Sequence, residues 1–197
     1  MIDVVFPENN ENEFFVMAKR LGYSGLVLVY SSQQEKITSP AGLKVRTAVL
    51  AEPVVARQLK KKGLLVFVKS SERDRIVLEQ GSADILFNVE NTMPKDYMHQ
   101  RGSGLNHIMC GLARKNNVAI GFGFSNILSA SGVQRARLLG RMMQNIMLCK
   151  KYGVKMVIGS FANDPWQMRS PHDLQAFFRV LGMHPVEAKK ALSGIPL

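Results

Sequence analysis

The sequence of 197 residues predicts an α/β fold, a TIM-barrel-like (β/α) barrel with seven clear strands, distorted or incomplete relative to the usual eight. Short apolar runs alternate with helical segments along the chain, and these runs are continuous rather than alternating in polarity. Such strands are typical of a parallel sheet that is buried on both faces. We expect a single domain that spans residues 1–197.

A doubly wound open sheet is the main alternative fold. That fold usually carries a glycine-rich phosphate-binding turn after its first strand. Here the first predicted strand, residues 2–6, is followed by Pro7, Glu8 and Asn9, which do not form such a turn. The barrel is therefore the preferred fold.

The first half of the chain contains five predicted strands, at residues 2–6, 25–30, 45–51, 64–68 and 84–89. Helices are predicted between them at residues 10–21, 52–62 and 71–80. Asn10 and Glu13 have the spacing of a helix N-cap and its N3 partner. Gly63 and Gly81 are typical C-terminal stops. Residues 35–44 give no clear element, and residues 39–42 have the composition of a loop.

The second half begins with a helix for which Ser103 is the expected N-cap. Its apolar stripe recurs at three- and four-residue spacing, at Leu105, Ile108, Met109 and Leu112. A strand at 118–124 should end in a polar tip, Ser125 and Asn126. The remaining predicted elements are a long helix at 132–152, a strand at 154–160, a helix from Ser170 to Gly182 and a short helix from His184.

The long helix at 132–152 should have a core face and a polar face. Its spacing predicts that Leu139, Met142, Met143, Ile146 and Met147 face the core. The opposite face should then carry Arg137, Arg141, Gln144 and Lys151.

The charge distribution indicates a polyanionic partner. The formal net charge is +11, and residues 97–163 contain nine basic residues and no acidic one. A segment of one sign creates a positive field that nucleic acid can occupy, although general solubility charge is the alternative reading. We find no basic amphipathic tail or long apolar span, so we expect no membrane role. The start of the sequence does not resemble a signal peptide, and the expected location is the cytoplasm.

The residue types needed for bond cleavage are not gathered at the predicted strand ends. These ends carry mostly uncharged polar residues, among them Ser125 and Ser160, which could simply cap the strands. The four histidines form no H-x-H or H-x-x-x-H pair, and both cysteines lie among apolar neighbours, as buried free thiols do. We therefore predict no catalytic residues and no metal site in this chain.

A surface that recognises folded RNA fits the sequence better. Arg101, Arg114 and Lys115 could combine with Arg137 and Arg141 to contact phosphates. Aromatic residues make up 8% of the chain and form no interleaved run, so recognition of backbone and shape is favoured over base stacking.

Several groups of residues resemble one known family. The runs RGSGLNH at 101–107 and KNNVAIGF at 115–122 resemble archaeal ribonuclease P protein component 3, the homologue of the thirty-kilodalton subunit of the eukaryotic enzyme. Further matches are Arg135, Ala136, Leu138, Leu139, Arg141, Met142 and Met143, then Ser160, Ala162, Trp166, Arg169, Pro171, Asp173, Leu174, Gly182 and Met183. The resemblance covers most of residues 84–190, whereas residues 1–80 agree mainly in their strand–helix pattern.

The resemblance implies a TIM-barrel-like fold related to the polymerase-and-histidinol-phosphatase group of metal-dependent phosphoesterases. It further implies a subunit of the ribonucleoprotein that removes 5′ leaders from precursor tRNA, in which Mg²⁺ acts at the catalytic RNA. Expected partners are the ribonuclease P RNA, precursor tRNA, ribonuclease P protein component 2 and other protein subunits. That phosphoesterase group has an H-x-H after its first strand, whereas this chain has Val4, Val5 and Phe6 there.

Six residues are predicted to contact RNA or to support that contact: Arg101, His107, Lys115, Arg135, Arg141 and Arg169. His107 could equally be a hydrogen-bonded structural histidine, and Arg135 could lay its stem along the helix. Two other functions remain as alternatives. One is a free-standing metal-dependent phosphoesterase, and the other is a barrel that only docks proteins.

Overall fold

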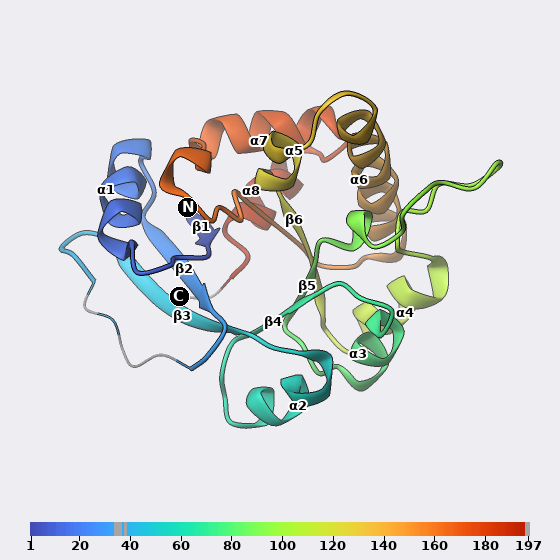
Figure 1. Ribbon diagram of the computed structural model, residues 1–197, viewed down its shortest axis with the longest axis horizontal. Coiled ribbons are helices and arrows are strands. Elements are labelled where there is room, and N and C mark those ends of the chain that lie inside the picture. Colours follow the sequence, from blue (N-terminus) through green and yellow to red (C-terminus); the bar gives the residue numbers. More distant parts are fainter. Residues whose placement is uncertain (34–36, 38, 196–197) are drawn as a thin grey trace.

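The computed structural model describes residues 1–33, 37 and 39–195, and these contain seven parallel strands wound into a nearly closed barrel (Figure 1). The spatial order of the strands is their order in the chain. The predicted α/β barrel with seven strands is therefore confirmed. The strands are β1 (Ile2–Val5), β2 (Gly25–Tyr30), β3 (Lys44–Leu50), β4 (Val66–Lys69), β5 (Ile85–Phe87), β6 (Ala119–Gly123) and β7 (Met156–Gly159).

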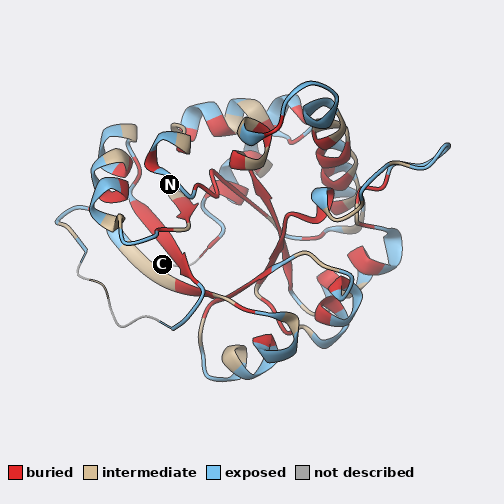
Figure 2. Ribbon diagram, viewed as in Figure 1, coloured by how far each residue is buried: buried red, intermediate tan, exposed pale blue. Residues whose placement is uncertain are grey.

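Helices cover the outside of this sheet, so that the strands are buried and the outer helix faces are exposed (Figure 2). The α-helices are α1 (Glu11–Leu21), α2 (Pro53–Lys61), α3 (Asp74–Gln80), α4 (His107–Lys115), α5 (Ser125–Ser129), α6 (Gly132–Tyr152), α7 (Pro171–Val180) and α8 (Pro185–Leu192). Two 3₁₀ turns, η1 (Val89–Asn91) and η2 (Pro165–Gln167), complete the elements. Throughout the described ranges, no helix is long and apolar enough to cross a bilayer.

The seam between β1 and β7 is held by a buried carboxylate, Asp3. β1 forms one isolated bridge with the segment just after β7, between Val5 and Ala162, and the Phe6 amide donates to the Ala162 carbonyl at 2.8 Å. Asp3 accepts hydrogen bonds from the Ser160 amide (2.6 Å) and from the Ser160 hydroxyl (2.7 Å). A side chain of β1 thus replaces the ladder that an eighth strand would supply.

The register of α6 differs from the prediction. Its buried residues are Leu138, Arg141, Met142, Asn145, Ile146 and Cys149, so the buried stripe is rotated from the predicted one. Met143 and Met147 were expected in the core but are 46% and 61% exposed. Arg141 was expected on the polar face but is buried. The buried stripe includes two polar residues because the loop after β5 offers them hydrogen-bond partners.

Several predicted element ends are also shifted. The N-cap of α4 is Asn106, whose side chain accepts from the Met109 amide at 2.9 Å, and the predicted cap Ser103 is buried further upstream. Ser125 and Asn126 begin the short helix α5 rather than a loop. The Asn10 side chain accepts from the Glu8 amide and does not cap α1. By contrast, the predicted cap of α7 is confirmed, since the Ser170 hydroxyl accepts from the Asp173 amide.

The unassigned stretch before β3 lies partly outside the described residues, whereas the predicted loop at 39–42 lies within them. Residues 35, 36 and 38 of the unassigned stretch 35–44 are among those not described, as is residue 34 of the polar segment after β2. Residues 41 and 42 form a turn that leads into β3 at Lys44, as the predicted loop requires.

The Asp3 seam should make stability depend on pH. Burial raises the pKa of Asp3 to about 6, and the hydrogen bonds from Ser160 and from the Val4 amide only partly offset this. Between pH 4 and 7 the unfolded chain therefore gives up this proton more readily than the folded chain does, so the Asp3 contribution to stability falls as pH rises. We expect this loss to reach roughly 2 kcal/mol and to disappear in Asp3→Asn.

Urea unfolding of both proteins at pH 4.5 and pH 7 measures this difference. Glu8→Gln, which changes an exposed carboxyl group, is the control and should behave like the wild type. Equal pH dependence in the wild type and in Asp3→Asn would contradict the role given to Asp3.

Candidate nucleic-acid interface

The mouth of the barrel, at the carboxyl ends of the strands, is filled by phenylalanine rings. Phe6, Phe67, Phe87 and Phe161 contact one another, with ring centroids 5.4 Å apart for Phe87 and Phe161 and 5.5 Å apart for Phe6 and Phe87. A Cβ on Gly123 would lie 2.8 Å from the Phe161 Cβ, so glycine in β6 makes room for these rings. Barrel enzymes keep their reactive groups at this end, and here it offers mainly hydrocarbon.

The polar residues predicted at the strand ends are used inside the protein. The Ser125 hydroxyl donates to the Phe161 carbonyl at 2.7 Å, and the Ser160 hydroxyl donates to Asp3. The Asn126 side chain donates to that of Asn88 at 2.7 Å. Within the described ranges, no group of three or more His, Cys, Asp or Glu side chains is arranged to hold a metal ion. Ser125 and Ser160 therefore join β7, β1 and α5.

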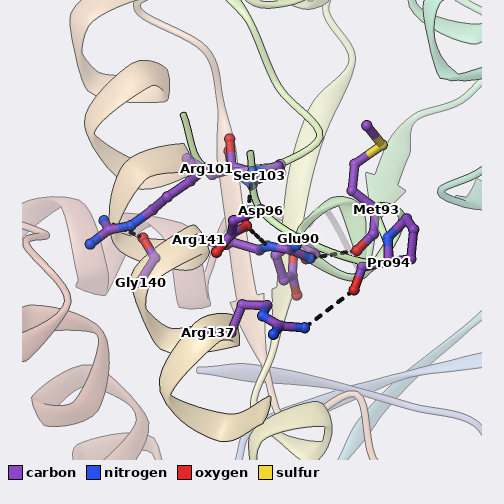
Figure 3. A network of polar contacts seen from close by, with 11 residues as sticks. Glu90, Met93, Pro94, Asp96, Arg101, Ser103, Arg137, Gly140 and Arg141 are labelled. Carbon is purple, nitrogen blue, oxygen red and sulfur yellow. Dashed lines mark hydrogen bonds and ion pairs between the residues drawn. The ribbon is translucent and has the colours of Figure 1, made fainter. Parts of the chain in front are cut away.

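Arg141, a predicted RNA-contacting residue, lies in the protein interior. It is 1% exposed, and its guanidinium pairs with Asp96 at 2.7 Å. The same group donates to the carbonyls of Glu90 (2.9 Å) and Met93 (2.7 Å), as Figure 3 shows. Any contribution of Arg141 to RNA binding must therefore act through the segment that it holds.

Three other predicted arginines bind main-chain carbonyls at separate places. Arg101 donates to Gly140 at 3.1 Å. Arg135 donates to Ala130 at 2.8 Å and to Ile127 at 3.1 Å, and so closes the end of α5. Arg169 donates to Met168 at 2.7 Å and lies 5.6 Å from the centroid of the Phe124 ring. These guanidinium groups are partly committed to the fold.

Lys115 and His107 are both exposed, at opposite ends of α4. Lys115 is in the last turn, and His107 is the first helical residue. No hydrogen bond of the His107 ring is found among the described residues, which disfavours the hydrogen-bonded structural histidine considered above. The six predicted residues are thus spread over the molecule and form no single patch.

A different set of exposed cations lies at the amino-terminal end of the barrel, where strands begin and helices end. We call this set the basic face, and it consists of Lys44, Lys61, Lys62, Arg114, Lys115, Lys151 and Lys155. Lysines and arginines in a last helical turn are stabilised by the negative end of the helix dipole. Glu79, at the end of α3, is an exposed acid at this end. Sequence reasoning missed Lys44, Lys61 and Lys62 because they lie outside the acid-free stretch.

A hollow of about 410 Å³ opens at this end of the barrel. Residues from β3, α2, the α4–β6 turn and β7 line it, among them Arg46, Lys60, Asn117 and Lys155. Asp84 also lines it, but its carboxylate is 3.2 Å from the Lys60 ammonium and accepts from the Val66 amide at 2.8 Å. Basic residues that are distant in the sequence, Arg46, Lys60 and Lys155, therefore line the same hollow.

Comparison with known proteins gives one consistent family. Residues 64–197 match the family model described as RNase P subunit p30. The ribonuclease P protein component 3 of Methanococcoides burtonii is 30% identical over 194 residues, which span 96% of this chain and 80% of the relative. That of Thermococcus kodakarensis is 30% identical over 174 residues, 85% of this chain and 76% of the relative.

A solved structure agrees with these relatives. A chain in the cryo-EM structure of archaeal ribonuclease P with mature tRNA superposes with a TM-score of 0.75 at 26% sequence identity. The match covers 98% of this chain and 87% of that one. From the family model and the relatives together, the chain belongs to the RNase P subunit p30 family.

Proposed function

We propose that this chain works in ribonuclease P as a subunit that binds RNA through its basic face and leaves the cleavage to the RNA. Family membership makes it a protein subunit of this tRNA-processing ribonucleoprotein. Its partners in the proposal are the ribonuclease P RNA, precursor tRNA, protein component 2 and other subunits, assembled in the cytoplasm. Mg²⁺ would act at the RNA during removal of the 5′ leader.

The observation that carries this proposal is the contrast between the basic face at the amino-terminal end of the barrel and the mouth at the carboxyl end, which phenylalanine rings fill. The amino-terminal end carries the exposed lysines of the basic face, and one of them, Lys155, also lines the hollow together with Arg46 and Lys60. Such side chains bind phosphates and release counterions without reading sequence. The carboxyl end, where a phosphoesterase would keep its metal ligands, is filled by the rings of Phe6, Phe87 and Phe161. This arrangement favours an RNA-binding subunit over a free-standing phosphoesterase.

Neutralising the basic face should weaken RNA binding. In the triple variant Lys61→Gln, Lys115→Gln, Lys155→Gln, we expect the affinity for ribonuclease P RNA to fall about tenfold or more near 100 mM salt. Each lost phosphate contact should also reduce the slope of log K against log salt by about 0.9. Filter binding of the assembled protein subunits across a salt series measures both quantities.

A matched control removes the same charge from the opposite end of the barrel. The variant Lys69→Gln, Arg73→Gln, Arg75→Gln changes exposed residues at the end of β4 and the start of α3. We expect it to keep a salt slope close to that of the wild type. An equal loss in both variants would show that net charge, and not the basic face, determines binding.

The phosphoesterase alternative has a direct test. The purified chain, incubated with phosphomonoester and phosphodiester substrates and Mn²⁺ or Zn²⁺, should give no turnover above buffer, because phenylalanine rings occupy the mouth of the barrel. Robust metal-dependent turnover without RNA would overturn the proposed role. A metal-free preparation of the same chain serves as the control.

A further inference from the structure

The loop at residues 92–101, which we call the finger, projects from the barrel between η1 and α4. Figure 1 shows it extending away from the body beside α4 and α6. The amide of Tyr97 donates to the Gln100 carbonyl at 2.8 Å and closes the turn at its tip. Tyr97 is 59% and Met98 is 93% exposed. Large side chains are therefore presented to solvent far from the apolar core.

Side chains of α6 hold the base of the finger on both its outgoing and its returning segment. Arg141 donates hydrogen bonds to the Met93 carbonyl and to the Asp96 carboxylate on the outgoing segment. Arg137 donates to the Pro94 carbonyl at 3.2 Å. The Asn145 side chain donates to the carbonyl of Ser103 at 2.7 Å, just after the returning segment. Figure 3 shows Arg137 and Arg141 directed from α6 toward this base.

The glycines that follow the finger allow its return path. A Cβ on Gly102 would lie 2.9 Å from the Lys95 carbonyl oxygen and from the Met93 Cβ. The outgoing and returning segments of the finger therefore lie too close together for any residue other than glycine at this position. Gly104 has a φ of +83°, and a Cβ there would lie 2.1 Å from the Val89 carbonyl oxygen. The RGSG run at 101–104 is thus the element that closes the finger against η1.

This anchoring exceeds what an ordinary surface loop requires. Removing a guanidinium from water is unfavourable unless its hydrogen bonds and charge are matched inside the protein. The Nε and Nη1 groups of Arg141 meet this condition through Asp96 and through the carbonyls of Glu90 and Met93, whereas its Nη2 has no hydrogen-bond partner among the described residues. These three bonds at the finger base fix the position of a loop whose tip makes no core contact. A protein that fixes an exposed tip in this way presents a preorganised contact to a partner.

The chemistry of the finger suits an RNA partner. Partial burial raises the pKa of Asp96, but hydrogen bonds from Arg141 and from the Gly102 amide outweigh this and hold that pKa below its usual value. The one carboxylate of the finger is therefore ionised and already paired. What remains exposed is Tyr97, Met98, His99 and Gln100, with Lys95 before them and Arg101, whose guanidinium donates to the Gly140 carbonyl, after them. Two of these side chains, Tyr97 and His99, carry aromatic rings. Rings with neighbouring cations stack on unpaired bases and neutralise the adjoining phosphates.

We propose that the finger inserts into the RNA of the ribonucleoprotein and stacks Tyr97 or His99 on unpaired nucleotides, with Arg141 as its positioning residue. This inference rests on the proposed function and adds to it a second contact, apart from the basic face. It also gives buried Arg141 a role in RNA binding that needs no direct contact with RNA.

Ultraviolet cross-linking of ribonuclease P assembled from this chain, its RNA, the other subunits and precursor tRNA tests the proposal. We expect nucleotide adducts on the peptide that contains Tyr97 and His99, and separate adducts near Lys115. The variant Tyr97→Ala, His99→Ala should lose the finger adduct and weaken RNA binding about fivefold or more for each stacked base. Met147→Ala, an exposed residue of α6 outside the finger, is the control and should bind normally.

Arg141→Lys tests positioning, because lysine keeps the charge beside Asp96 but cannot reach the carbonyls of Glu90 and Met93 at the same time. We expect it to lose the finger adduct, to keep the adducts near Lys115 and to add no further loss of affinity in the triple variant with Tyr97→Ala and His99→Ala. A merely structural role would lower the melting temperature and leave the finger adduct in place.

The two proposals fail in different ways. Wild-type affinity of the tip variant, with adducts near Lys115 intact, would overturn the finger and leave the basic face standing. Adducts of the finger with a protein subunit instead of RNA would also overturn it. Absence of RNA adducts anywhere on the chain would overturn the proposed function itself.

Discussion

The buried guanidinium of Arg141 is the interaction on which the position of α6 and of the finger base depends. It ties α6 to the segment after β5, where the chain leaves the barrel and does not return until α4. Because a buried cation without partners is strongly unfavourable, α6 and the finger base can adopt this arrangement only together. The same interaction explains why the buried face of α6 differs from the predicted one. Arg141 and Asn145 face inward, and Met143 and Met147 are therefore exposed.

The closure of the barrel divides the molecule into two ends with different chemistry. Asp3 joins β1 to Ser160 after β7, which brings Phe6 and Phe161 to within 6.2 Å of each other, centroid to centroid, in the mouth. The end that usually holds catalytic groups is thereby filled with hydrocarbon. The helix ends carry their lysines to the opposite end, where the helix dipoles favour them. One fold thus removes the usual catalytic position and creates a cationic surface.

Local signals in the sequence were sufficient to predict the strands, the length of α6 and the Ser170 cap, because each depends on neighbouring residues. The burial of Arg141 was not predictable, because its partners lie about fifty residues upstream. The helical periodicity of α6 fits more than one rotation of the helix, and it does not decide whether the arginine or the methionines face the core. The basic face was missed for a related reason. Lys61 and Lys62 come from the nearly neutral part of the chain, and only the barrel brings their neighbours Lys60 and Gly63 to the same hollow as Lys155.

The acid-free stretch has a different meaning in three dimensions from the one its composition indicates. Of its nine cations, six donate to main-chain carbonyls: Arg101, Arg114, Arg135, Arg137, Arg141 and Lys150. Two of them also pair with carboxylates outside the stretch, Arg141 with Asp96 at 2.7 Å and Lys150 with Glu187 at 3.5 Å. Peptide carbonyls and these two distant acids together explain how the stretch can lack carboxylates of its own. Lys115, Lys151 and Lys155 remain exposed at the amino-terminal end of the barrel. In this stretch, six cations hold the fold together through their hydrogen bonds, and the three that remain exposed belong to the surface proposed to bind RNA. Net charge alone does not distinguish the two groups, whereas the hydrogen-bond partners do.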